Sequence, residues 1–163
     1  MGVKSLLAVL VMLASAAAGV GAWSLTRGRS PLHPEISAYS HGQLVRVGPY
    51  RYCKVLDLND CENPGTLGEL RVNARDPVQL SVSTSIGRAP WLLLPVYEDA
   101  ANPSTPPPFY PPGSRLAVTI PTVDAKQGRL TGIAVQLLTV VRDRAGEQHY
   151  VPHAEWSVRT VWG

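Results

Sequence analysis

Alternation of apolar and polar residues with a period of two is the feature that most limits what this chain can fold into. In residues 77–83, Val and Leu alternate with Gln and Ser, and residues 115–120 repeat the pattern. Such alternation is typical of a half-buried strand. Residues 91–97 and 133–141 are apolar on both faces and rich in β-branched side chains, which favours central strands over helices. The second of these leads through a turn into residues 147–150 and 156–162 and predicts a hairpin.

Shorter strands are expected at residues 44–47, 50–53 and 69–72, which gives six to eight strands and no amphipathic helix among them. The pattern predicts an all-β fold, an antiparallel immunoglobulin-like β-sandwich that follows one N-terminal transmembrane or signal helix. Trp91 is the candidate core tryptophan of the third strand. Cys53 and Cys61 are too close in sequence to form the usual inter-sheet disulfide of immunoglobulin domains, so the likeness is one of architecture only.

The N-terminal segment predicts insertion into a membrane. Residues 5–23 carry no charge and are almost entirely apolar. As a helix they span about 28 Å, close to the roughly 30 Å of a bilayer core, but small residues at Ala14, Ala16 and Ala18 also suit signal cleavage. We expect a membrane anchor or signal segment at 1–26, an extended tether at 27–39 and an exported β-sandwich domain at 40–163. The expected location is the cell membrane, single-pass with the domain outside, or, as the alternative, secretion after cleavage.

Net charge argues against a nucleic-acid partner. The formal charge of +3 resides in Lys4, Arg27 and Arg29, and from Ser30 onward twelve basic residues balance twelve acidic ones. A neutral domain lacks the basic surface that binding to a phosphate backbone requires. The membrane is therefore the one partner that charge and hydropathy indicate.

The two cysteines, Cys53 and Cys61, are expected to form a disulfide, because they are close in sequence and an exported domain meets an oxidising environment. Closing this loop would stabilise the fold by about 2.5 kcal/mol in the chain-entropy model. No second Cys or His pair accompanies them, and His149 and His153 would lie about 13 Å apart on a strand, so neither a metal nor a cofactor is expected.

A proline-rich stretch at residues 102–113 contains six prolines and predicts an extended loop. Phe109 and Tyr110 lie within it, and a loop tip cannot easily bury two aromatic rings, so they form the candidate interaction loop. The alternative is that the stretch is a stiff crossover between the two sheets.

His153 and Glu155 form a second, weaker candidate, a polar site in which a carboxylate on the same strand face could orient the imidazole. No nucleophile is recognisable near them, and the chain has no Gly-x-Ser-x-Gly elbow. No catalytic residue is therefore assigned.

Four short motifs stand out along the chain: residues 34–39 (PEISAY), 47–50 (VGPY) with Cys53 and Cys61, 86–91 (IGRAPW) and 151–156 (VPHAEW). In these motifs the chain resembles a family of small exported actinobacterial proteins, best known from mycobacteria and classed as domain of unknown function 2771. The resemblance implies a cell-envelope setting and a membrane-attached exported protein, with no activity, cofactor or catalytic residue to carry over.

We therefore expect a non-enzymatic cell-envelope protein whose exported domain contacts another envelope protein or a lipid carrier. Two alternatives remain open. One is a small-ligand or lipid-binding protein, and the other is a hydrolase of envelope glycan or lipid.

Overall fold

A computed structural model describes residues 33–99 and 106–163, and these form an all-β fold built from antiparallel sheets. Within them the single helix, α2 (Thr84–Gly87), is one turn long. The strands are β1 (Ile36–Ser40), β2 (Gln43–Val47), β3 (Arg51–Lys54), β4 (Asp57–Glu62), β5 (Leu67–Val72), β6 (Val78–Val82), β7 (Trp91–Tyr97), β8 (Phe109–Tyr110), β9 (Ala117–Ile120), β10 (Val123–Asp124), β11 (Gly128–Arg142) and β12 (Gln148–Trp162).

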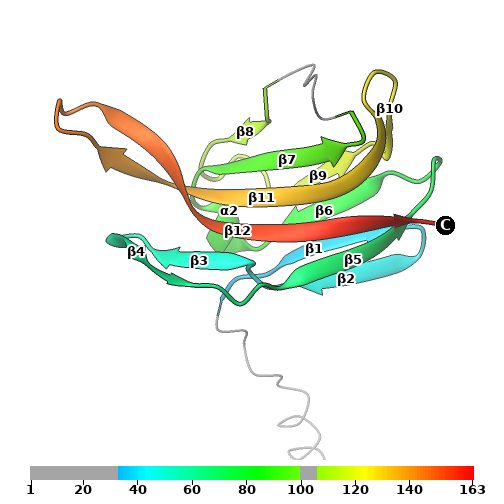
Figure 1. Ribbon diagram of the computed structural model, residues 1–163, viewed down its shortest axis with the longest axis horizontal. Coiled ribbons are helices and arrows are strands. Elements are labelled where there is room, and N and C mark those ends of the chain that lie inside the picture. The colour runs from blue at the N-terminus through cyan, green and yellow to red at the C-terminus, as the bar shows by residue number, and fades with distance from the viewer. Residues whose placement is uncertain (1–32, 100–105) are drawn as a thin grey trace, which may run out of the picture. The chain divides into compact units, whose positions relative to one another are not determined.

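The strands form two sheets (Figure 1). The smaller has the order β2-β1-β6-β9, and the larger has the order β4-β3-β12-β11-β7-β8, with β10 paired to β11 and β5 paired to β12. Every pairing is antiparallel except that of β5 with β12, which is parallel. This pair departs from the sequence prediction. β3 pairs with β12 only at Ala154 and Glu155. The same edge of β12 is therefore left for β5 from Ser157 onward.

One hydrophobic core receives the inward-facing side chains of both sheets. The strand at 78–82 contributes every second residue, as its alternation predicted. Trp91 and Trp156 are the largest fully buried side chains, so the predicted core position of Trp91 is confirmed. The indole Nε1 of Trp156 donates a hydrogen bond to the carbonyl of Pro34 at 2.8 Å, which satisfies a polar group that burial would otherwise penalise.

The longest pairing in the structure is the hairpin of β11 and β12, each 15 residues long. It confirms the predicted strand-turn-strand, although the sequence indicated two shorter segments where β12 is continuous. Leu137 pairs with Ala154 and Leu138 with Pro152, so His153 is the extra residue of a β-bulge. In Figure 1 the loop end of this hairpin extends past the other strands of its sheet.

The structure differs from two expectations drawn from the sequence. Residues 36–39, expected in the tether, belong to β1 and pair with both β2 and β6, because Ile36 and Ala38 are buried in the core. The proline-rich stretch at 102–113, considered above as a crossover between the sheets, contains β8, which pairs with β7 in the larger sheet. The chain crosses to the smaller sheet only after Tyr110.

The predicted anchor or signal helix at 1–26 lies outside the described residues. Among residues 33–99 and 106–163, no helix has the length and apolar character needed to cross a membrane.

Gly68 tests the packing of the parallel strand. A Cβ added there would overlap Cγ2 of Val47 and lie 3.4 Å from Cγ2 of Val158. Because Val47 is buried, we expect Gly68→Ala to lower the free energy of unfolding by about 1–3 kcal/mol, measured by urea denaturation of the full chain.

Gly48→Ala is the matched control, because its added Cβ would meet only Oγ1 of Thr66, at 3.8 Å. We expect it to change the stability by less than about 0.5 kcal/mol. Equal stability losses in the two variants would contradict the close packing of β5 against β2.

Candidate functional site

The predicted disulfide between Cys53 and Cys61 is present and links β3 to β4. Beside it lies a cluster of rings centred on Tyr52. His33 stacks on Tyr52 at 4.4 Å between ring centroids, and Trp156 meets the same ring edge-on at 6.4 Å. These rings join the start of the domain to β3 and β12, and the disulfide fixes β3 to β4.

His153 faces this cluster and is 4% exposed. Its Nδ1 lies 3.2 Å from the carbonyl oxygen of Cys53, and because a carbonyl can only accept, Nδ1 carries the proton. Glu155 accepts a hydrogen bond from Nε2 of Gln136 at 3.0 Å. Within the part of the chain that the structure describes, no hydrogen bond joins His153 to Glu155, since the bulge at His153 breaks the alternation between them. The proposal that they form a polar site stays a prediction.

The candidate interaction loop contains two rings with different surroundings. Phe109 and Tyr110 form β8 and point to opposite faces of the sheet. Tyr110 is partly buried and stacks on Trp91 at 4.2 Å. Phe109 is 42% exposed on the outer face, opposite Leu92 of β7.

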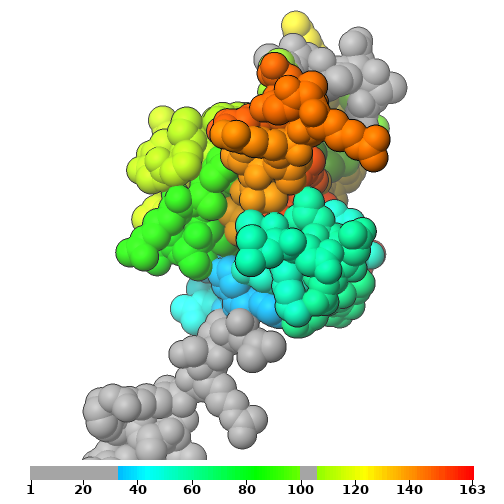
Figure 2. Space-filling view, turned by 90° about the vertical axis from the view of Figure 1, so that its left-hand side faces the viewer, coloured from blue at the N-terminus to red at the C-terminus, as the bar shows by residue number. Residues whose placement is uncertain are grey.

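Phe109 belongs to an exposed apolar cluster that also includes side chains of the β11–β12 hairpin. Its ring lies 5.3 Å from that of Tyr150, which is 56% exposed and pairs across the hairpin with Val140. We call Phe109, Val140 and Tyr150 the aromatic surface. Figure 2 shows the side of the molecule where the hairpin (orange) lies beside the segment that carries β8 (yellow-green).

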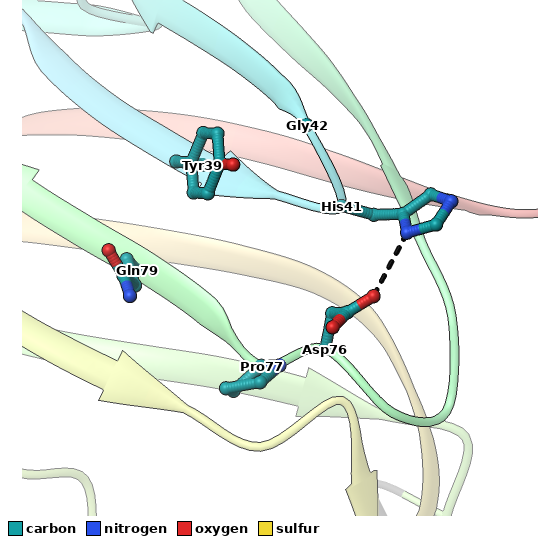
Figure 3. Close-up of a pocket in the computed structure, with 6 residues that line it drawn as sticks. All are labelled: Tyr39, His41, Gly42, Asp76, Pro77 and Gln79. Carbon is teal, nitrogen blue, oxygen red and sulfur yellow. Dashed lines mark hydrogen bonds and ion pairs between the residues drawn. The ribbon is translucent and has the colours of Figure 1, made fainter.

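A second site lies at the turn between β1 and β2, on the smaller sheet (Figure 3). It is an open pocket of about 480 Å³. Its described lining residues come from this turn and from the start of β6: Tyr39, His41, Gly42, Asp76, Pro77 and Gln79.

The local backbone explains why His41 points into this pocket. Ser40 pairs with Gln43, so His41 and Gly42 form a two-residue hairpin loop. Both have positive φ, 46° and 77°, as a type I′ turn requires. Histidine adopts this backbone region more readily than most non-glycine residues.

Asp76 is the electrostatic centre of the pocket. Its Oδ2 accepts hydrogen bonds from Nδ2 of Asn73 at 2.7 Å and from Nδ1 of His41 at 2.9 Å. These contacts, that of Asn73 foremost, lower the pKa of the Asp76 carboxyl from its usual value. The carboxylate is therefore ionised at neutral pH, and because a carboxylate can only accept, Nδ1 of His41 carries the proton of the hydrogen bond between them. Nδ2 of Asn73 also lies 2.9 Å from this Nδ1, so the three side chains form one compact cluster.

Neither Tyr150 nor the His41–Asp76 pair was predicted from the sequence. The turn that holds His41 had a local signal, because a His-Gly dipeptide lies between two short alternating segments, which is typical of a hairpin, but the approach of Asp76 had none. Tyr150 had none, because its contact with Phe109 depends on the pairing of the whole larger sheet.

Comparison with known proteins gives the family. A family model described as "Protein of unknown function (DUF2771)" matches residues 29–161. The chain belongs to this family. This confirms the resemblance found in the sequence motifs.

Two mycobacterial relatives are similar over nearly their whole length. Proteins named as uncharacterized from Mycobacterium tuberculosis and Mycobacterium bovis are each 62% identical to this chain over 161 residues, which covers 99% of this chain and 98% of theirs. No solved structure matches the chain.

The lowered pKa of Asp76 predicts a pH dependence. Because the folded-state pKa lies below the ordinary 3.8, Asp76 stabilises the fold above that value, and this stabilisation is lost as pH falls through the folded pKa. In an NMR titration of the full chain, we expect Asn73→Ala and His41→Ala each to raise the Asp76 pKa toward 3.8.

Asn59→Ala is the control for this titration, because Asn59 lies on β4, where its backbone N–H, which the substitution keeps, bonds the carboxylate of Asp57 and not that of Asp76. It should leave the Asp76 pKa unchanged. An Asp76 pKa that does not move in Asn73→Ala would show that the hydrogen bond from Asn73 does not hold the carboxylate in its ionised form.

Proposed function

We propose that this protein is a membrane-tethered, exported module of the cell envelope that acts by binding, and that the aromatic surface contacts another envelope protein. The observation that carries this proposal is the packing of two exposed rings, Phe109 of β8 and Tyr150 on the arm, the end of the β11–β12 hairpin beyond the bulge. Exposed apolar clusters of this kind mark interaction sites more often than isolated surface residues do.

The shape of the arm favours binding by these residues. On β11, Leu138 and Val140 share the face opposite to Leu137, because the bulge inserts its extra residue on β12. Leu138 is 4% exposed yet lies outside the main core. The aromatic surface thus adjoins a buried leucine, and aromatic side chains beside packed apolar groups are typical binding anchors.

Charges around the arm favour a protein over a lipid surface as the partner. At the hairpin tip, Arg142 and Arg144 are balanced by Asp143 and Glu147. Binding to anionic lipid requires clustered Lys and Arg, whereas a mixed polar rim around apolar anchors is the usual composition of a protein interface.

Two further features support export and tethering. The uncharged apolar segment 5–23 has the length of a membrane span, and the Cys53–Cys61 disulfide suits an oxidising compartment outside the cytoplasm. We include in this proposal the immunoglobulin-like sandwich arrangement, which two antiparallel sheets with a shared core support.

The binding role can be tested with a photo-crosslinking amino acid placed at Phe109 or Tyr150 of the full chain in mycobacterial cells. We expect both positions to give the same discrete, higher-mass product that contains one other protein. Tyr50, which is 47% exposed but outside the aromatic surface, is the matched control position and should not give this product.

A charge within the aromatic surface should break the contact. We expect Val140→Asp to reduce the crosslinked product about tenfold or more, because a partner would have to bury an unpaired carboxylate. Val96→Asp is the matched control and should not reduce the product, because Val96 is 41% exposed, similar to the 47% of Val140, but lies outside the aromatic surface. Crosslinking to lipid alone, or equal crosslinking at Tyr50, would contradict the proposal.

A further inference from the structure

We propose that the pocket beside the β1–β2 turn is a binding site for a neutral oligosaccharide, separate from the aromatic surface. It is lined on the outer face of the smaller sheet by Tyr39, His41, Asp76 and Gln79, together with Gly42 and Pro77 (Figure 3). A volume of about 480 Å³ lies within the range of small-ligand sites, roughly 300–1,000 Å³.

Tyr39 provides an apolar platform at this site. Its neighbours Ala38 and Ser40 are buried, so the Tyr39 side chain points away from the core and is 43% exposed. A tyrosine ring has an apolar face and a polar hydroxyl. That combination matches a sugar ring, which presents C–H groups on its faces and hydroxyls at its edge.

Polar groups that can bind hydroxyls lie next to this ring. Gln79 is the cross-strand neighbour of Tyr39 on β6, and its amide can both donate and accept hydrogen bonds. The Asp76 carboxylate has lone pairs beyond those used by Asn73 and His41, and Nε2 of His41 remains available. A ligand that donates and accepts at closely spaced positions fits this set, as adjacent hydroxyls do.

The charge of the pocket selects against ionic ligands. Its six described lining residues include no Lys or Arg, and its carboxylate repels anions such as phosphate or sulfate. Asp76 is the one carboxylate among the described lining residues, and a single carboxylate supplies too few oxygen ligands for Ca²⁺ or Mg²⁺. A neutral polyol meets neither difficulty.

The sheet surface beyond the pocket can accommodate more than one sugar ring. The strand register places four residues side by side across β2, β1, β6 and β9: Leu44, Tyr39, Gln79 and Thr119. All four are exposed on the face of the sheet that points away from the core. This row continues the platform on both sides of Tyr39. We therefore assign the site to an oligosaccharide and not to a monosaccharide.

Saturation-transfer difference NMR on the full chain in detergent tests the assignment, because it detects weak binding and identifies the sugar protons in contact. The probes are linear tetrasaccharides of glucose, galactose, mannose and arabinose, each neutral, with a sulfated tetrasaccharide for comparison. We expect transfer to the ring C–H protons of at least one neutral probe and none to the sulfated one.

Three variants locate the binding. We expect Tyr39→Ala to weaken it about tenfold, Tyr39→Phe to preserve most of it, and Asp76→Asn to weaken it severalfold. Tyr50→Ala, which removes a tyrosine of similar exposure elsewhere on the surface, should bind as the unmodified chain does.

Three results would overturn the assignment. They are the absence of transfer to every neutral probe, a preference for the sulfated probe, and binding that survives in both Tyr39→Ala and Asp76→Asn. Because none of these measurements involves Phe109, Val140 or Tyr150, the outcome is independent of the proposed protein contact.

Discussion

The pairing of β11 with β12 is the constraint on which the larger sheet depends. β11 pairs on its other side with β7 and β10, and β12 pairs with β3 and β5. A slip of β12 by one residue against β11 would turn Trp156, which is fully buried, toward the outer face. The bulge at His153 changes the register once, and beyond it both strands continue toward the tip of the hairpin.

The length of this hairpin also produces the aromatic surface. Near Val135 the hairpin contributes to the shared core, whereas near Val140 its side chains lie outside that core. An arm that continues past its sheet cannot bury both faces, so Val140 and Tyr150 remain exposed. The exposure that supports a binding role is thus a consequence of strand length, and it coincides with β8 because β7 places Phe109 on the same side.

Features with a local signal could be predicted from the sequence. The hairpin, the strand at 78–82, buried Trp91 and the disulfide all follow from alternation, composition or close spacing. The strand at 36–40 could not be separated from a tether, because five residues preceded by Pro31 and Pro34 give a weak pattern. The parallel pairing of β5 and the approach of Asp76 to His41 depend on contacts between segments that are distant in sequence, so no short stretch of residues gives a pattern that predicts them.

Hydrogen bonding distinguishes a structural cluster from a binding site in this molecule. Three of the segments that mark the family meet around Tyr52, where Trp156 bonds the carbonyl of Pro34 and His153 bonds that of Cys53. These polar groups are directed inward and paired, so the cluster stabilises the start of the domain. At the turn of β1 and β2, by contrast, the carboxylate of Asp76 and the ring of Tyr39 are exposed and retain unused bonding capacity. Groups arranged in this way contribute little to stability and much to recognition, which is why the candidate sites lie on the outer faces and not at the buried histidine.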